Sequence, residues 1–377
     1  MSTFDPIGDG TRVVAAGQPV EDADGTPLAT SPVFASTYRL RGEPHGDHRY
    51  GRMSNPTWTA FETAVAALEH GPVVSFASGM AAVSAALFAT LRSGSVLLVP
   101  DDCYYAIRTL ADGPLRELGI QVRTASSRTE ALLEQLDGAT LLWLEVPTNP
   151  RLDVVDVRRL AAAAHDAGAL VAVDTTTATP LGLPALTLGA DLAVASDTKA
   201  LAGHSDLLLG HVACASDELA ERVRSWRTAS GGIPGPFETW LAHRSLTTLD
   251  VRLARQAANG LAVAEALARS AAVAEVRHPW LAGDPSEEAA RSQLRRGNGL
   301  VSFTLADAET AQRFLSASRL VTETTSFGGV HSTAERRGRW RGDDVPPGFV
   351  RMSCGIEDTA DLVADVRVAL AASGWSE

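Results

Sequence analysis

The strongest constraint on the fold is the alternation of short apolar segments with helical segments between residues 73 and 196. Segments this short and this apolar favour buried strands over helices. Buried strands that alternate with helices predict a parallel sheet covered on both faces, with its ligand at the carboxyl ends of the strands. The expected strands are 73–76, 95–100, 120–125, 140–146, 169–174 and 192–196, and the expected helices include 58–69, 79–91, 129–136 and 157–167.

The length of 377 residues exceeds the size at which one hydrophobic core stops growing, so a large and a smaller domain are expected. Residues 1–55 are rich in Gly, Pro, Asp and Thr without a sustained period, which predicts an irregular arm that packs on another surface. Residues 56–235 hold the predicted parallel sheet. Residues 236–377 begin with a long helical pattern at 237–272, which links the domains, and continue as a smaller α/β domain. The expected elements of this domain are strands near 300–305 and 349–353 and a helix at 359–372.

The composition argues against several kinds of partner. The 45 acidic residues outnumber the 33 basic ones, and no basic cluster offsets the net charge of -12, so nucleic acid is not expected to bind. No segment approaches the roughly 18 uninterrupted apolar residues of a membrane span, and the first ten residues do not resemble a signal peptide. We therefore expect a cytoplasmic protein with no membrane partner. Cys103, Cys214 and Cys354 lie far apart without metal-ligand spacing, which predicts reduced thiols and no metal site.

A turn of small residues, ASGMAA at 77–82, lies between an expected strand and an expected helix. Small residues let the amides of Gly79 and Met80 point at an anion, and the helix dipole adds to the attraction. An ordinary tight turn from strand to helix would have the same composition. This segment by itself is therefore weak evidence for a phosphate site.

Asp174 ends the otherwise apolar strand at 169–174. A carboxylate in such a place is costly to bury without a cationic partner. A protonated pyridine nitrogen is one such partner, and an Asp that holds this proton makes the ring an electron sink. The alternative is a structural role for Asp174, as an N-cap or as the partner of a local Arg.

Lys199 is the only lysine of the chain and lies in the segment ASDTKALAGHSDLLLG at 195–210. Its neighbours are mainly small or hydroxylated, and no acidic residue lies three or four positions away, so it does not resemble a surface lysine in a helical ion pair. If the chemistry needs a lysine amine as nucleophile, Lys199 is the sole candidate. Ser196 and Thr198 can direct hydroxyls at the same anion that the 77–82 turn approaches.

Together these segments resemble the pyridoxal phosphate (PLP)-dependent enzymes of cysteine and methionine metabolism, a group that includes cystathionine γ-synthase, cystathionine γ-lyase, cystathionine β-lyase and methionine γ-lyase. The similarity extends over nearly the whole chain. Further motifs that carry it are YGRMSNPT at 50–57, EVPTNP at 145–150, GPFETWLAHRSLTTL at 235–249, SFGGVHS at 326–332 and FVRMSCGIE at 349–357. The resemblance implies an α/β fold of type I, like aspartate aminotransferase, with a mostly parallel sheet in a large domain and a smaller C-terminal α/β domain.

The resemblance also implies how pyridoxal 5'-phosphate is held. Lys199 forms a Schiff base with it, Asp174 pairs with the pyridine nitrogen, and the ring of Tyr104 stacks on the cofactor. The phosphate group lies among Gly79, Met80, Ser196 and Thr198 of one subunit and Tyr50 and Arg52 of its neighbour. The protein is accordingly expected to be a homo-oligomer, with a dimer as the active unit and two dimers assembled as a tetramer.

The small-molecule substrate is implied to be an amino acid whose α-carboxylate binds Arg351, with Asn149 and Ser326 close by. A surface salt bridge of Arg351 and a turn role of Asn149 before Pro150 are the alternatives. Tyr104 is expected to act as an acid or base, a role for which nearby cations would lower its pKa.

Several positions depart from the family's usual pattern. The chain has YYAIR where the family usually has Tyr-Gly-Gly-Thr, so Tyr105 is an alternative to Tyr104 as the stacking residue. Ala106 stands where methionine γ-lyases commonly have Cys, which weakens that assignment. Thr325 and His331 stand where cystathionine γ-lyases often have Glu.

The expected reaction is a cystathionine γ-lyase-like α,γ-elimination on a sulfur-containing amino acid, which yields a thiol, a 2-oxo acid and ammonia. Lys199 would remove the Cα proton and then act at Cβ. A γ-replacement, as in cystathionine γ-synthase, and a methionine γ-lyase-like activity are the alternatives, in primary or specialised metabolism. A non-catalytic protein with this fold is the alternative from another class.

Overall fold

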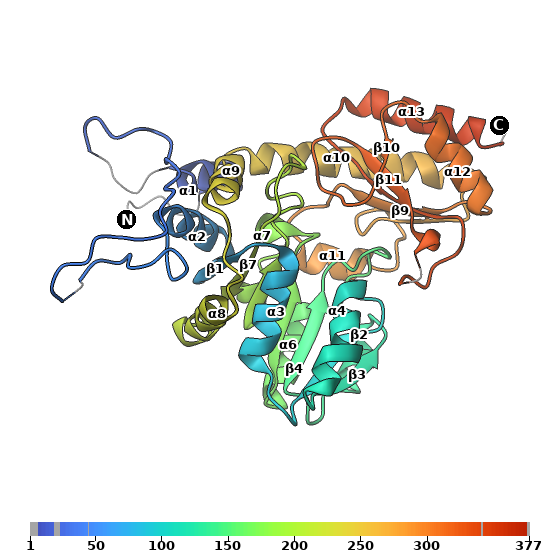
Figure 1. The fold of residues 1–377 in the computed structure, drawn as a ribbon. Coiled ribbons are helices and arrows are strands. Elements are labelled where there is room, and N and C mark those ends of the chain that lie inside the picture. Colours follow the sequence, from blue (N-terminus) through green and yellow to red (C-terminus); the bar gives the residue numbers. More distant parts are fainter. Residues whose placement is uncertain (1–6, 19–22, 44, 341, 375–377) are drawn as a thin grey trace.

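The protein contains two β-sheets joined by a long helix (Figure 1). The computed structural model describes residues 7–18, 23–43, 45–340 and 342–374. Among the helices in these ranges, none combines the length and the apolar character needed to cross a bilayer. The strand order of the larger sheet is β1 (Val73–Phe76), β7 (Gly210–Cys214), β6 (Leu192–Ala195), β5 (Leu170–Asp174), β4 (Leu141–Glu145), β2 (Val96–Pro100) and β3 (Gln121–Ala125).

The larger sheet is mostly parallel, as the sequence predicts, because only β7 runs antiparallel to its neighbours β1 and β6. Its side chains alternate between two hydrophobic cores: Leu142 and Leu144 of β4 face one, and Leu141 and Trp143 face the other. Helices cover both faces, so the strands are buried almost throughout, except the edge strand β3.

Helices on one face supply Phe61, Leu160 and Ala242 to its core, and helices on the other face supply Val83 and Val223. The helical elements of this part are α2 (Pro56–Glu69), α3 (Gly79–Thr90), α4 (Tyr105–Leu110), the π-helical turn η1 (Ala111–Leu115), α5 (Thr129–Leu133), α6 (Val157–Asp166), α7 (Thr179–Gly182), the 3₁₀ turn η2 (Ala185–Leu188), α8 (Asp217–Ser230) and α9 (Pro236–Leu246).

The smaller sheet has five strands and a separate core that includes Phe303, Phe314 and Val350. Only β10 and β11 pair in parallel. The strand order is β10 (Thr322–Glu323), β11 (Thr333–Arg336), β12 (Phe349–Ser353), β9 (Leu300–Thr304) and β8 (Glu275–Arg277), and the helical elements are α11 (Glu287–Gln293), α12 (Ala308–Ala317), the 3₁₀ turn η3 (Arg337–Arg339) and α13 (Thr359–Ala372).

The helix α10 (Leu249–Ala268) connects the two cores. Leu249 and Leu253 at its start belong to a core of the larger sheet, whereas Val263 and Leu267 near its end belong to the core of the smaller sheet. The predicted single helix at 237–272 is wrong in one respect, because it is interrupted: α9 ends at Leu246 and α10 begins at Leu249. The hydroxyls of Thr247 and Thr248 donate to carbonyl oxygens three residues earlier, which competes with the helical pattern at this point.

The arm at the start of the chain differs from its prediction in one segment. Residues Asp9–Ala16 form a helix, α1, whose Val13 is buried against the larger sheet's core. The rest of the described arm is irregular, with one isolated bridge between Thr37 and Tyr50, and it projects away from the body of the protein (Figure 1).

Candidate active site

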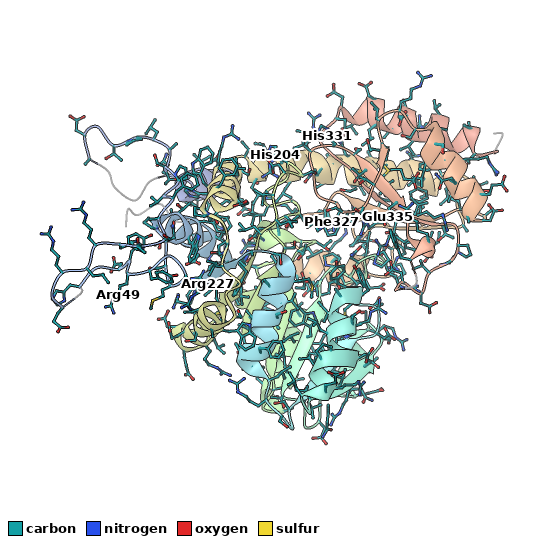
Figure 2. The ribbon with its side chains drawn as sticks, viewed as in Figure 1. Arg49, His204, Arg227, Phe327, His331 and Glu335 are labelled. Atoms are coloured by element: carbon teal, nitrogen blue, oxygen red, sulfur yellow. The ribbon has the colours of Figure 1, made fainter. Side chains whose placement is uncertain are left out.

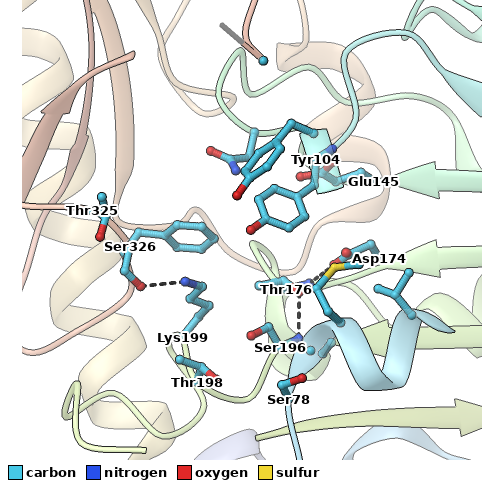
Figure 3. Close-up of a pocket in the computed structure, with 18 of the residues that line it drawn as sticks. Ser78, Tyr104, Glu145, Asp174, Thr176, Ser196, Thr198, Lys199, Thr325 and Ser326 are labelled. Atoms are coloured by element: carbon cyan, nitrogen blue, oxygen red, sulfur yellow. Dashed lines mark hydrogen bonds between the residues drawn. The ribbon is translucent and has the colours of Figure 1, made fainter. Parts of the chain in front are cut away.

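A cavity of about 570 Å³ lies at the carboxyl ends of β4, β5 and β6 (Figure 3). The start of α3 and residues of the smaller sheet close its other sides. The cavity brings together most residues that the sequence singles out, as expected for the carboxyl edge of a parallel sheet. Those that line it are Gly79, Met80, Tyr104, Asn149, Asp174, Ser196, Thr198, Lys199, Ser326 and Arg351.

The start of α3 lies directly against the end of β6. Ser78 is the N-cap, and its hydroxyl accepts a hydrogen bond from the amide of Ala81 at 3.2 Å. A Cβ atom on Gly79 would lie 2.6 Å from Cβ of Ser196, so this close approach requires glycine. The amides of Gly79 and Met80 are in the first turn, where a helix offers no acceptor, and they form part of the cavity wall.

Asp174 is buried at the end of β5, between β4 and β6. Its Oδ1 accepts the amide of Thr176 at 2.9 Å, and the hydroxyl of Thr176 accepts the amide of Ser196 at 2.9 Å. Burial raises the pKa of Asp174, and the hydrogen bonds of Thr176 oppose that effect. Within the described ranges Asp174 has no ion-pair partner, so its carboxylate is free to neutralise a cationic group in the cavity.

Lys199 is half-buried, and its Nζ donates a hydrogen bond of 2.6 Å to Oγ of Ser326 (Figure 3). Burial, followed by the positive charge of Arg351, lowers the pKa of Lys199 to about 8. A larger fraction of this amine is therefore neutral near pH 7 than for a lysine in water, and only the neutral form is a nucleophile or base.

The turn that carries Lys199 is fixed from the side of α10. Arg252 is buried, and its guanidinium donates to the carbonyl oxygens of Ala200 at 2.6 Å and Leu201 at 2.9 Å. Gly203 has a positive φ of 73°, and a Cβ atom there would lie 2.1 Å from Nη1 of Arg252. The linking helix thereby holds the backbone immediately after Lys199.

Ser326 joins the lysine to the predicted carboxylate site. Its backbone has a φ of 76°, which is uncommon for a residue with a side chain and is typically kept where function requires it. Its hydroxyl accepts from Lys199, and its carbonyl oxygen accepts from Nη2 of Arg351 at 2.8 Å.

Arg351, on β12, is almost fully buried and points toward the larger sheet. Its Nη1 donates to Oδ1 of Asn149 at 2.6 Å, and its Nη2 lies 3.1 Å from Oε2 of Glu335. Its Nε is buried and has no hydrogen-bond partner in the described part of the chain. Burial and then Arg337 lower the pKa of Arg351 to about 10, so it remains charged near neutral pH. A buried cation with an unused donor suits a carboxylate ligand.

Sequence reasoning missed Glu335, which lines the cavity together with Phe327 (Figure 2). Its side chain is fully buried, and the same oxygen, Oε2, contacts Arg351 at 3.1 Å and Arg337 at 3.0 Å. Arg337 is held on its other side by Asp343, with Nε 2.7 Å from Oδ2. The segment ERRGR at 335–339 is dense in charge and carries no apolar alternation, so its pattern is typical of an exposed loop.

The two adjacent tyrosines both line the cavity, with ring centroids 4.9 Å apart. The amide of Tyr104 donates to Oε2 of Glu145 at 2.6 Å, which fixes the start of α4. Burial and then Tyr105 raise the pKa of Tyr104 to about 12, and the opposing effect of Arg337 is smaller. The expected lowering of this pKa is therefore wrong, and the hydroxyl of Tyr104 stays protonated near neutral pH.

Tyr50 and Arg52 do not line the cavity of their own chain. Nη1 of Arg52 donates to the carbonyl oxygen of Thr228 at 2.6 Å, and Tyr50 is exposed. Of the two positions that depart from the lyase pattern, Thr325 lines the cavity, whereas His331 is exposed and does not line it.

Comparison with known proteins agrees with this geometry. The profile of the Cys/Met metabolism PLP-dependent enzyme family matches residues 10–371. The chain belongs to this family. A Streptomyces coelicolor protein named "Putative cystathionine gamma-lyase" is 53% identical over 96% of this chain and 93% of its own length. Cystathionine gamma-synthase of Mycobacterium tuberculosis H37Rv is 36% identical over 96% of this chain and 97% of its own length.

The same fold is found in solved structures of the family. The apo structure of CalE6, a methionine gamma lyase from Micromonospora echinospora, superposes with a TM-score of 0.91. It is 34% identical in sequence, and the alignment covers 97% of this chain and 100% of that one. The expected fold, enzyme class and cofactor are thus confirmed, whereas these relatives carry the names of three different reactions.

As a member of this PLP-dependent family, the chain has a cavity that fits the cofactor. The unpaired carboxylate of Asp174 suits a protonated ring nitrogen, and Lys199 supplies the amine that the aldehyde requires. Gly79 lies so close to Ser196 that only glycine fits there. This approach leaves the first amides of α3 and the hydroxyl of Ser196 in the cavity wall, which suits a phosphate group.

We predict that Lys199 of the PLP-free protein titrates with a midpoint near 8, because burial and Arg351 disfavour its charged form. Since Lys199 is the only lysine, reductive ¹³C-methylation gives a single lysine NMR signal, whose shift is followed from pH 6 to 11. Acid-denatured protein returned to each pH in urea is the reference for the unfolded chain. A midpoint near 10.5 in the folded protein would contradict the prediction.

Proposed function

We propose that the protein catalyses a cystathionine γ-lyase-like α,γ-elimination on a sulfur-containing amino acid. The observation that carries the proposal is the placement of the only lysine between Asp174 and a buried arginine with an unused donor. Cleavage of the bond between Cγ and sulfur releases a thiol, and hydrolysis of the remaining four-carbon product gives a 2-oxo acid and ammonia.

In this proposal the chain's residues divide the binding of the cofactor. Lys199 would attach it covalently, Asp174 would accept a hydrogen bond from its protonated ring nitrogen, and Tyr104 or Tyr105 would cover the ring. Gly79, Met80, Ser196 and Thr198 bind the phosphate. Bound PLP supplies the electron sink that makes loss of the substrate's Cα proton feasible.

The remaining residues bind the substrate and move its protons. Arg351 binds the α-carboxylate through Nε, while Asn149 and Glu335 keep its guanidinium in place. Lys199 takes the Cα proton and then acts at Cβ. Tyr104, protonated because its pKa is raised, donates a proton to the sulfur that leaves Cγ.

The experiment that tests this proposal is a product assay with cystathionine, methionine, homocysteine, and O-activated homoserine plus cysteine, run side by side. We expect 2-oxo acid and ammonia from cystathionine at the highest rate, and none from the Lys199→Ala protein. Formation of cystathionine from activated homoserine and cysteine as the main reaction would replace elimination by γ-replacement. Turnover of Lys199→Ala at even a few per cent of wild type would contradict the role of the lysine.

Arg351→Lys should raise the KM of the enzyme by about tenfold or more, because a point charge does not reproduce the planar donors of a guanidinium. The visible absorbance of the bound cofactor should change little, since Arg351 is assigned to the substrate. The matched control is Arg255→Lys, an exposed arginine on α10 whose ion pair with Asp358 lies at the surface. An unchanged KM in Arg351→Lys would place the carboxylate site elsewhere.

We also propose a homodimer as the active unit, with two dimers forming a tetramer, in the cytoplasm. The arm supports this assembly, because it projects from the body (Figure 1). It also exposes large apolar side chains. Those side chains are Leu28, Phe34, Leu40, Tyr50 and Met53. The arm of residues 1–55 would carry Tyr50 and Arg52 to the partner's phosphate, the segment 56–235 would bind the cofactor, and the segment 236–377 would complete the substrate site.

Subunit complementation tests the dimer. Arg52→Ala and Lys199→Ala proteins, each nearly inactive, are mixed in equal amounts under conditions that exchange subunits. Half of the dimers are then mixed, and one of the two sites in each receives an intact Lys199 and an intact Arg52, so about a quarter of wild-type activity should return. Confirmed exchange without recovered activity would mean that Arg52 acts within its own subunit or not on the cofactor.

A further inference from the structure

A second cluster of ionisable groups lies beneath the lysine turn and is not part of the proposed reaction. His211 on β7 is fully buried between two carboxylates, those of Asp197 and Glu69. Its Nδ1 lies 2.6 Å from Oδ1 of Asp197, and its Nε2 lies 3.2 Å from Oε1 of Glu69. All three side chains have an exposed fraction of 0%.

The cluster is costly to bury, because it combines one cation with two carboxylates. Burial alone would lower the pKa of His211, but Asp197 and then Glu69 raise it to about 10. The second oxygens of both carboxylates, Oδ2 of Asp197 and Oε2 of Glu69, are buried without a hydrogen-bond partner in the described ranges. A buried charged cluster whose hydrogen bonding is incomplete contributes little to the free energy of folding.

The place of Asp197 in the chain gives the cluster a local effect. Its neighbours Ser196 and Thr198 line the cavity, while its own side chain points to His211 behind the cavity wall. Its carbonyl oxygen accepts the amide of Ala202 at 2.9 Å, which closes the turn around Lys199. The contact between Asp197 and His211 therefore lies directly behind two residues of the cavity wall.

The opposite strand supplies a rigid anchor for this contact. His211 pairs with Ala195 across β6 and β7 and with Ser75 across β1 and β7, so its backbone is held on both sides. Thr198 is also tied to this region, because its hydroxyl donates to the carbonyl oxygen of Leu209 at 3.2 Å.

We propose that the hydrogen bond between His211 and Asp197 is a positioning contact for PLP, which holds Ser196, Thr198 and Lys199 in their binding arrangement. Glu69 contributes to the charge of His211 but lies on the side away from the turn. The proposal depends on the cofactor of the family and not on which sulfur amino acid is cleaved.

Asp197→Ala tests this proposal, because it removes the contact and leaves a balanced pair of His211 and Glu69. The matched control is Glu69→Ala, which removes the other carboxylate and leaves the contact at the turn. Asp197→Asn is the conservative variant, since its amide oxygen still accepts from Nδ1 of His211. The measurements on the full chain are PLP affinity by titration of PLP-free protein, Tm, and amide exchange of residues 196–203.

We expect Asp197→Ala to bind PLP about tenfold or more weakly and to exchange the amides of 196–203 faster, as for loss of a hydrogen bond to a charged group. Glu69→Ala should lower Tm by about as much as Asp197→Ala does, yet its PLP affinity should stay within about threefold of wild type. The PLP affinity of Asp197→Asn should also stay within about threefold of wild type. Wild-type affinity and exchange in Asp197→Ala would overturn the proposal, as would an equal loss of affinity in Glu69→Ala.

If Asp197→Ala does not yield folded protein, the triple variant Glu69→Gln, Asp197→Ala, His211→Leu decides the question. It leaves no buried charge in the cluster, so its fold is expected to be retained. Weakened PLP binding with faster exchange at 196–203 supports the positioning role. Wild-type affinity in this variant overturns it, since the cluster would then affect stability alone. Neither PLP affinity nor amide exchange depends on which reaction the enzyme catalyses. Failure of this proposal can therefore be distinguished from failure of the proposed reaction.

Discussion

Two short hydrogen bonds between the sheets hold the active site together. Nζ of Lys199 reaches Ser326, and Nη1 of Arg351 reaches Asn149. Lys199 and Asn149 lie in loops that follow strands of the larger sheet, whereas Arg351 and Ser326 belong to the part built around the smaller sheet, so the cavity exists only while the two sheets keep their relative position. The burial of the arginine, the lowered pKa of the lysine and the strained backbone at Ser326 all follow from this junction.

The junction between the two sheets buries the guanidinium groups of Arg351 and Arg337 away from water. The carboxylate of Glu335 offsets the cost of burying them. One of its oxygens contacts two guanidinium groups, those of Arg351 and Arg337, and Asp343 supplies Arg337 with a second carboxylate. A buried cation without such a partner would cost several kcal/mol. Within the described ranges Arg351 nevertheless keeps an unused donor, Nε, which is suitable for a substrate that brings its own carboxylate.

The sequence predicts the parts of the site that follow apolar strands. Asp174 and Lys199 stand out because each follows an apolar strand and has mainly small, apolar or hydroxylated neighbours, and a parallel sheet brings such positions to one edge. The six strands of the larger sheet proposed from the sequence are all present, and the seventh, Gly210–Cys214, escaped notice because glycine and histidine begin it. The resemblance to the family added the residues of the smaller sheet, Arg351 and Ser326.

Other features depend on contacts that no local pattern contains. Glu335 is buried only because Arg351 and Arg337 approach it from a neighbouring strand and the following turn. The pKa of Tyr104 is raised first by burial and then by Tyr105, and both depend on how the chain packs around the ring. Position 211 is a single histidine in an apolar segment, so its two carboxylate partners, 14 and 142 residues away in sequence, could not be foreseen.

The path of α10 limits how the two halves can move. The helix enters the core of the larger sheet at Leu253 and the core of the smaller sheet at Val263, so both ends are anchored in packed side chains. Between these points Gly260 touches the backbone of Asn298, where a Cβ atom would lie 2.5 Å from its carbonyl oxygen. A hinge in this stretch would have to break helical hydrogen bonds and pull apolar groups from a core. Residues 253–263 therefore form a rigid connection between the two cores, and any motion that admits substrate has to arise outside this stretch.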